Sequence, residues 1–103
     1  MANTYKNAKV DLTTTNATTV LTTPVGSTNI IKSILASEDS GNADTITLTI
    51  TDTASAVFSL FKVKAVGANT TVELLTQPLV LQDSEILKAT AATANRLHLV
   101  VSY

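Results

Sequence analysis

Residues 45–51 read Thr-Ile-Thr-Leu-Thr-Ile-Thr, and this strict alternation constrains the fold more than any other stretch of the chain. A period of two is the side-chain period of a β-strand, so Ile46, Leu48 and Ile50 share one face. Thr is stiff about χ1 and suits a pleated surface, which fits the four outward positions. The run therefore predicts a strand that is buried on one face and exposed on the other.

The same composition extends along the whole chain, in which Thr, Val, Ile and Leu are abundant and helix signals are almost absent. Alternation and turn residues predict about eight strands. Their ranges are 5–12, 17–23, 28–37, 44–53, 56–65, 71–76, 79–90 with an irregularity, and 95–103, with a hairpin loop at 89–96. This spacing predicts an all-β fold, a single β-sandwich of mostly antiparallel strands with a jelly-roll or an immunoglobulin-like topology. A length of 103 residues, 45% of them hydrophobic, fits one domain over residues 1–103.

Charge and composition disfavour several classes of partner. The formal net charge is −1 and only 15% of the residues are charged, so we expect no nucleic-acid partner, which would need a basic surface. No apolar run approaches the ~20 residues that span a bilayer, and the start lacks the apolar segment of a secretory signal, so we expect no membrane partner and a non-exported product. The chain has no cysteine for disulfides or thiolate zinc sites, and we expect no cofactor.

Three carboxylates, Glu38, Asp39 and Asp44, surround the turn residues 40–42 just before the alternating run. One interpretation is a corner between two strands, with solvated acids that serve solubility, because Ser, Gly and Asn favour turns. The other is a structural calcium site, because carboxylates are natural ligands of calcium. The stretch lacks the ligand spacing and the terminal Glu of an EF-hand loop, so we expect the corner and keep the three acids as calcium candidates.

Catalytic patterns are weak. The single histidine, His98, could join a Ser-His-Asp constellation only with a distant acid, Asp11, Asp52 or Asp83, and the sequence contains no G-x-S-x-G elbow and no phosphate loop. Asp83 and Glu85 could form a pair of catalytic carboxylates, but we expect them to accept backbone N–H groups at the start of a strand. The sequence therefore predicts a protein that is not an enzyme.

Two predicted strands carry apolar residues on both faces. In residues 30–35, Ile30 and Ile34 fall on one face, and Ile31 and Leu35 fall on the other. One interpretation is that a sheet edge or a loop covers the second face. The other is an outer apolar patch that packs against a neighbouring subunit or another partner.

The same holds for residues 57–63, where Val57, Phe61 and Val63 are predicted to form a core face, with Phe58 and Leu60 opposite. We take Ile30, Ile34, Phe58 and Leu60 as candidates for an interface, and expect Phe58 and Leu60 to be buried only in an assembly.

Residues 17–103 contain two further segments of note, TVLTTPVGSTNIIKSILASEDSGNADTITLTITD and PLVLQDSEILKATAATANRLHLVVSY. In these segments the chain resembles small virion structural proteins of tailed bacteriophages, particularly those of marine phages. In this chain and in those virion proteins, a Pro-containing turn precedes IIKSI, and a polar turn precedes an alternating strand. A PLVLQDSEIL segment then leads to a last strand that ends near VSY. Gln82 and Asp83 stand where such proteins often carry a Gly-Asp turn.

The resemblance implies a β-sandwich that decorates or joins parts of a phage particle. We expect a capsid decoration or cement subunit, located in the virion after assembly in the host cytoplasm, with the major capsid or tail proteins as partners. A subunit associated with the neck, tail or fibre is the next expectation. A homo-oligomer of cyclic symmetry, such as a trimer, would cover the sheet edges. The residues also leave open a receptor- or glycan-binding module, assisted by calcium at Glu38, Asp39 and Asp44.

Overall fold

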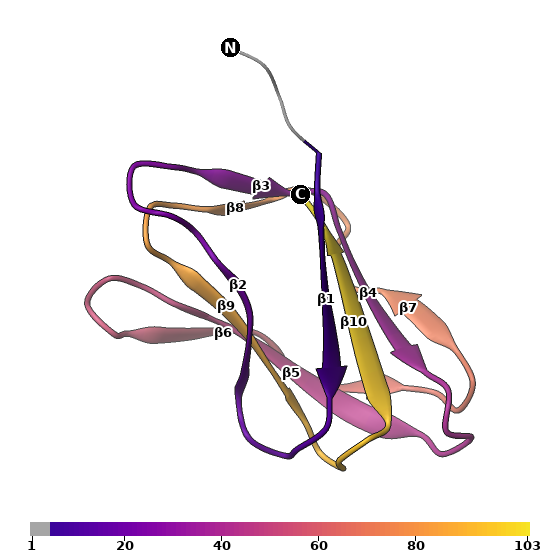
Figure 1. Ribbon diagram of the computed structural model, residues 1–103. Helices are drawn as coiled ribbons and strands as arrows, with labels where there is room; N and C mark the ends of the chain where they lie inside the picture. The colour runs from indigo at the N-terminus through magenta and orange to yellow at the C-terminus, as the bar shows by residue number, and fades with distance from the viewer. Residues whose placement is uncertain (1–4) are drawn as a thin grey trace.

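The chain is one long antiparallel β ribbon that doubles back on itself (Figure 1). The computed structural model describes residues 5–103. The ten strands are β1 (Asn7–Leu12), β2 (Thr18–Thr22), β3 (Asn29–Ile31), β4 (Ser33–Glu38), β5 (Asp44–Thr51), β6 (Val57–Val66), β7 (Thr71–Glu73), β8 (Leu79–Leu81), β9 (Ile86–Ala91) and β10 (Leu97–Ser102). β1 pairs with β10, β2 with β9, β3 with β8, β4 with β7 and β5 with β6. The ribbon therefore reverses at the turn between β5 and β6.

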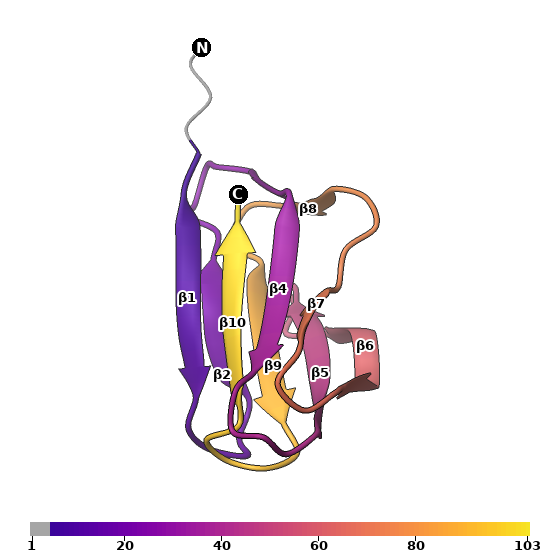
Figure 2. The ribbon, with the colours of Figure 1, turned by 90° about the vertical axis from the view of Figure 1, so that its right-hand side faces the viewer.

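Two further pairings roll this ribbon into a sandwich. β10 also pairs with β4, and β9 also pairs with β5. The result is sheet A, in the order β1-β10-β4-β7, and sheet B, in the order β2-β9-β5-β6 (Figure 2). Eight strands rolled in this way form a jelly roll, so the predicted all-β sandwich is confirmed and the structure selects this topology over the immunoglobulin-like one.

The two short strands β3 and β8 form a separate two-stranded sheet at one end of the sandwich (Figure 1). Two of the predicted strands are broken to form it, which is why the structure has ten strands where eight were predicted. The range 28–37 is interrupted at Lys32, whose N–H donates to the carbonyl of Ser102 at 2.7 Å. The range 79–90 contains the turn 82–85, where Ser84 has a φ of 64°, and this turn is the expected irregularity.

The core lies between sheets A and B. Ile46, Leu48 and Ile50 of β5 are buried, as the alternation predicts, and so are Leu97, Leu99 and Val101 of β10. Ile31 and Leu81 extend this cluster under the β3–β8 sheet. Each of these strands has a second layer of structure on one face only, which is the condition for a period of two.

The predicted hairpin loop at 89–96 is wrong in kind. β9 continues to Ala91, and residues 92–96 carry the chain from sheet B to sheet A, with Asn95 at a φ of 66°. The segment is therefore a connection across the sandwich, because β9 and β10 are not neighbours in one sheet. Within residues 5–103, no helix is long and apolar enough to cross a membrane.

Candidate functional site

The acidic corner is built around Glu38, the last residue of β4. The backbone N–H groups of Ser40, Gly41 and Asn69 donate to its carboxylate at 2.9, 3.0 and 3.1 Å, and the Ser40 hydroxyl donates as well. The backbone N–H of Glu38 donates to the carbonyl of Thr70 at 2.9 Å. Glu38 therefore joins two loops, the corner 39–43 and the β6–β7 turn 67–70.

These contacts change the acidity of Glu38, whose side chain is fully buried. Burial raises the pKa of the carboxyl. The hydrogen bonds from the Ser40 side chain and from the backbone of Asn69, Ser40 and Gly41 lower the pKa by more than burial raises it, to about 2. The carboxylate is therefore ionised at neutral pH and its acceptor positions are occupied by the loops. The predicted corner is confirmed, but the interpretation of this acid as a solvated group is wrong.

The other two calcium candidates have different surroundings. Asp44, also buried, accepts the N–H of Thr93 at 3.0 Å, and Asp39 is exposed beside His98. Among residues 5–103, no group of three or more His, Cys, Asp or Glu side chains is placed to hold a metal ion. The three carboxylates thus have separate partners: Glu38 bonds the corner and the β6–β7 turn, Asp44 bonds the connection 92–96, and Asp39 lies beside His98 of β10.

Strand periodicity contains the signal that the acids at both ends of the corner are internal. Glu38 follows Ile34 and Ala36 at intervals of two, and all three are buried. Asp44 likewise precedes Ile46 at an interval of two on the buried face of β5. The alternation therefore points both acids inward, and each finds backbone donors at the end of its strand.

His98 lies on the outer face of sheet A between two carboxylates. Its Nε2 is 3.2 Å from Asp11 on β1, and its Nδ1 is 3.6 Å from Asp39. Ser37 is its cross-strand neighbour on β4, so Asp11, His98 and Ser37 form a row across three strands. A catalytic triad needs one ring nitrogen directed at the serine, whereas here each nitrogen faces an acid. This row therefore lacks the geometry of a Ser-His-Asp triad.

Asp83 and Glu85 organise the turn between β8 and β9. Asp83 accepts the N–H of Gly26 at 2.8 Å and the hydroxyl of Ser84 at 2.6 Å, and these bonds lower the pKa of its carboxyl. Glu85 accepts the N–H of Gln82 at 2.7 Å. Both acids thus accept backbone N–H groups beside a strand, as the sequence predicts, and Asp83 also fastens this turn to the turn 24–27.

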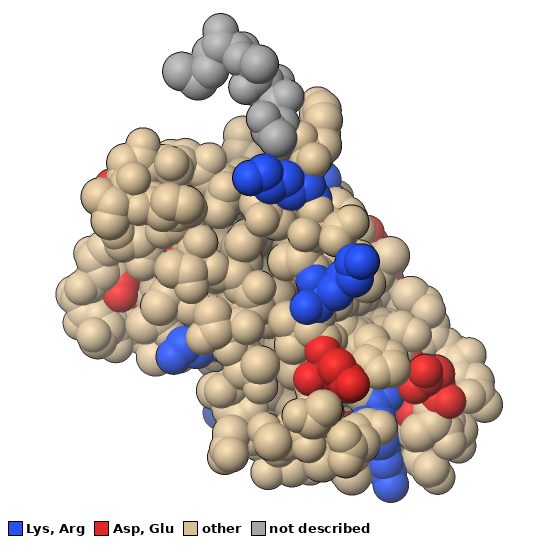
Figure 3. All heavy atoms as spheres, in the orientation of Figure 1, with Lys and Arg blue, Asp and Glu red and all other residues tan. Residues whose placement is uncertain are grey.

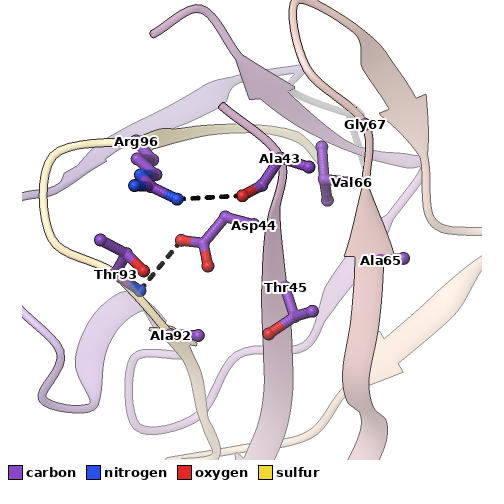
Figure 4. A pocket seen from close by; sticks show the side chains of 9 residues that line it. All are labelled: Ala43, Asp44, Thr45, Ala65, Val66, Gly67, Ala92, Thr93 and Arg96. Atoms are coloured by element: carbon purple, nitrogen blue, oxygen red, sulfur yellow. Dashed lines mark hydrogen bonds between the residues drawn. The ribbon is translucent and has the colours of Figure 1, made fainter. Parts of the chain in front are cut away.

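A hollow of about 340 Å³ lies beside the corner, and Figure 4 shows the side chains that line it. Two of its polar groups already have partners. Asp44 points toward the N–H of Thr93, and Nη1 of Arg96 donates to the carbonyl of Ala43 at 3.1 Å. Apart from Asp44 and Arg96, the lining residues have small, uncharged side chains and belong to the ranges 43–45, 65–67 and 92–93. The carboxylate of Asp44 and the guanidinium of Arg96 are therefore already hydrogen-bonded to the backbone around the hollow.

The exposed apolar side chains form two groups on the surface. The first, which we name the ribbon patch, consists of Ile30 on β3 and Val80 on β8, a cross-strand pair with 50% exposure each. Val25, in the preceding turn, is exposed as well. Few charged side chains occur over this end of the molecule in the view of Figure 3. The ribbon patch is a surface where apolar groups remain in contact with water.

Ile34, which was expected to share a face with Ile30, is fully buried. The break at Lys32 separates β3 from β4, so the alternation does not run through from one strand to the next. Leu35 therefore takes the outward position that was assigned to Ile34. The burial of Ile34 contradicts its assignment to an interface, whereas for Ile30, which is exposed, the interface stays a prediction.

The second group, which we name the β6 patch, consists of Val57, Phe58 and Val63, which are exposed to 61%, 56% and 61% and are spread along β6 without sharing one face. Adjacent residues of a strand point to opposite faces, so the exposure of both Val57 and Phe58 means that the start of β6 extends beyond the sandwich. Figure 1 shows this end of β6 projecting from the body. Leu60 and Phe61 are partly buried against the core.

β6 therefore differs from its prediction. Val57 and Val63 were expected in the core and are exposed, while Leu60 was expected to be exposed and packs partly against the core. Two register shifts against β5 disrupt the alternation, one around Leu60 and one opposite Thr47. At the second shift Val63 has a φ of 55°, and its N–H donates to Oγ1 of Thr47 at 3.1 Å.

The sequence analysis missed Val80 and Val25 as surface residues. Val80 lies between Leu79 and Leu81 in an unbroken apolar run, so no polar neighbour marks its outward face. Its outward position follows only from its pairing with Ile30.

No protein-family model matches the chain, and the searches of curated proteins and of solved structures likewise give no match.

Proposed function

We propose that the chain is a non-enzymatic structural subunit of a bacteriophage particle, most simply a decoration or cement protein that binds the capsid exterior. The observation that carries the proposal is the exposure of apolar side chains at the ribbon patch and along β6 of a jelly roll. Exposed apolar side chains gathered on one part of a surface favour protein contacts, because burying them removes apolar area from water. The resemblance of residues 17–103 to small virion proteins supplies the identity of the particle.

The placement of the patches supports binding through an end of the sandwich. The ribbon patch belongs to a two-stranded sheet that covers the core with Ile31 and Leu81 and presents Ile30 and Val80 outward. The side chains of Ile30 and Val80 can therefore pack against a partner protein without any change in the core beneath the β3–β8 sheet. Jelly rolls also serve as capsid and lectin domains, which is an analogy at the level of the fold.

Positions at the neck, tail or fibre use the same kind of contact and are outcomes of the test. The calcium-assisted version of a glycan-binding module has less support, because Glu38 and Asp44 are committed to loop N–H groups. A module that binds glycans without metal would still need exposed rings, and in residues 5–103 the exposed rings are those of Tyr5 and Phe58.

The test mixes the purified chain with phage particles assembled without it and images them by electron cryomicroscopy. Regular density on the capsid surface is the expected result. Density confined to the neck, tail or fibres would replace decoration with the second position. Bare particles, together with binding of the chain to host cells, would overturn the virion assignment in favour of a receptor-binding module.

Matched variants identify the contact. Ile30→Thr with Val80→Thr, and separately Phe58→Thr, remove the outward apolar groups and keep residues that suit strands. Tyr5→Thr is the control, because Tyr5 is also a large exposed side chain, at 74%, but belongs to neither patch. We expect one of the patch variants to lose particle density while the control retains it. Equal occupancy for all variants would contradict the role of the patches.

A further inference from the structure

The outer face of sheet A carries a row of four residues, one from each strand. Lys9 on β1 is opposite Val100 on β10, Val100 is opposite Leu35 on β4, and Leu35 is opposite Glu73 on β7. Lys9 and Glu73 are exposed at the two edges of the sheet, and the two apolar side chains are partly exposed between them. The row therefore reads positive, apolar, apolar, negative from one edge to the other.

A neighbouring row lies two residues along the strands. It consists of Asp11, His98, Ser37 and Thr71 in the same strand order. Its ionisable groups lie toward the β1 edge, and its hydroxyl groups lie toward the β7 edge. Neither row is symmetric, so the way in which a second copy can stack on this face depends on the symmetry axis.

Consider a second copy stacked on this face with a two-fold axis parallel to the strands. Each row then lies on the same row of the partner with its direction reversed, so β1 covers the partner's β7. Lys9 meets the partner's Glu73, Val100 meets the partner's Leu35, and both contacts occur twice. In the second row, Asp11 meets the partner's Thr71 and His98 meets the partner's Ser37, so no like charges are opposed.

The other two-fold axis in the plane of the face runs across the strands. With that axis along the central row, Lys9 would face the partner's Lys9, and Glu73 would face the partner's Glu73. Opposed like charges disfavour such a contact. The charges of the row thus favour the axis parallel to the strands over a crossed axis placed along this row.

We propose that the outer face of sheet A binds the same face of a second copy, with the two-fold axis parallel to the strands. Aligned packing of two sheets, with strand directions within ~30° and a separation of ~10 Å, is the ordinary geometry for such a contact. The inference concerns the isolated chain and does not rest on the proposed function. In this arrangement the homo-oligomer of cyclic symmetry is a dimer.

The edge strands offer no comparable surface. β1 carries Lys9 and Asp11, β2 and β6 have register shifts, and β7 has three residues. Charges, bulges and short strands are the devices by which sheet edges avoid pairing with other chains. The sheet faces are therefore the better route to self-association.

Glu73 keeps its charge for this contact. Burial raises the pKa of its carboxyl, but hydrogen bonds from the Ser33 hydroxyl and from the backbone N–H groups of Ile34 and Leu75 lower it to a greater extent. These bonds hold the ionised group at the exposed edge of the sheet, where the partner's Lys9 would meet it in this arrangement.

The area of the outer face of sheet A limits the affinity of the proposed dimer. Three strands of six residues and one of three, ~4.8 Å apart and at ~3.3 Å per residue, cover roughly 330 Å² on each copy. Stable complexes bury about 800 Å² per partner, so we expect a weak, concentration-dependent dimer. Salt should weaken it further, because the Lys9 and Glu73 contacts lie at the rim.

The first test is sedimentation equilibrium of the full chain up to millimolar concentration, at low and high salt. Lys9→Glu places a carboxylate opposite the partner's Glu73 at two contacts and should weaken the dimer about tenfold or more. Lys62→Glu is the control, because it makes the same charge change at an exposed position of β6. A monomer at every concentration, or equal effects of the two substitutions, would overturn the proposal.

The second test determines the axis. The chain has no cysteine, so Asn7→Cys accepts a single spin label on β1 without removing Lys9. Labelled copies are mixed with unlabelled copies enriched in ¹⁵N, so that only contacts between copies broaden the amide signals. Broadening of residues 71–75 is expected. Broadening of residues 7–11 would establish the crossed arrangement and contradict the proposal.

Discussion

β5 and β6 are hydrogen-bonded neighbours in sheet B, yet β5 buries its apolar side chains and β6 leaves several of its own exposed. β5 buries every second residue from Asp44 to Ile50. β6 leaves Val57, Phe58 and Val63 in solvent and buries only Val66 fully. Both sequences are rich in residues that suit strands, so composition does not explain the difference.

Position in the sheet does explain it. β5 has β9 on one side and β6 on the other, and it lies over the core. β6 is the edge of the sheet and has no strand beyond it. An alternating pattern fixes a buried face only where a second layer covers that face, and the projecting start of β6 has none. The two strands thus differ in their surroundings more than in their sequences.

The largest expected effect comes from truncating a β5 side chain. Leu48→Ala should lower the free energy of unfolding by about 3 kcal/mol, because Leu48 is fully buried and its loss leaves a cavity. Phe58→Ala, on β6, should cost less than about 1 kcal/mol, although it removes a larger side chain. Urea denaturation of both variants measures the difference. Similar losses would mean that the start of β6 is packed in solution, and the comparison would fail.

Glu38 gives the next effect, and its dependence on pH has a defined sign. Because the pKa of the folded carboxyl is lowered to about 2, the ionised form stabilises the fold above the ordinary carboxyl range, and this contribution is lost as the pH falls toward 2. Glu38→Gln should therefore be less stable at neutral pH and should lose less stability on acidification than the wild type does.

The control for Glu38 is Asp39→Asn, a change at the adjacent residue. Asp39 is exposed, and among the described residues its carboxylate accepts no backbone N–H. Thermal unfolding from neutral to acidic pH should give nearly the wild-type profile for Asp39→Asn and a flatter one for Glu38→Gln. Parallel profiles for Glu38→Gln and the wild type would show that the loop hydrogen bonds do not depend on the charge.

Much of β5 and β10 could be predicted because one local rule governs them. The alternation of Ile46, Leu48 and Ile50 and that of Leu97, Leu99 and Val101 each specify one buried face, and both strands lie where two sheets meet. The same rule, extended by one step, would have placed Glu38 and Asp44 inside. What it cannot supply is the source of their hydrogen bonds, because Asn69 and Thr93 are distant in sequence.

The exposure of Val57, Val63 and Val80 could not be predicted, because it depends on the rolled topology. Which strand becomes an edge follows from the β9–β5 and β10–β4 pairings, and these are long-range. The outward position of Val80 likewise depends on its pairing with Ile30. Periodicity describes each strand alone, whereas exposure is decided by the neighbours that the fold provides.

The hydrogen bond that holds the bulge of β6 to β5 should contribute a smaller effect. Thr47→Val removes the hydroxyl that accepts the N–H of Val63, and should cost about 1 kcal/mol. Thr49→Val is the control, because Thr49 has the same partly exposed setting on β5 and also borders a register shift, but among the described residues its hydroxyl accepts no N–H from β6. Chemical denaturation compares the two. A larger loss for Thr49→Val would show that the hydroxyl of Thr47 does not hold the bulge.

The smallest effect, of opposite sign, tests whether β6 stores strain at its second bulge. Val63 has a φ of 55°, a conformation that costs a β-branched residue more than it costs glycine. Val63→Gly should raise the free energy of unfolding by about 0.5 kcal/mol, because relief of strain exceeds the added entropy of the unfolded chain.

Val57→Gly is a close control for this gain, because Val57 has the same side chain and the same exposure of 61% in the same strand, but no positive φ. It should lower stability by about 1 kcal/mol, as glycine does in an extended strand. The two valines thus separate backbone strain from loss of the side chain. If both substitutions lowered the unfolding free energy equally, the bulge would be unstrained, and the bend of β6 away from the sandwich would follow from its edge position alone.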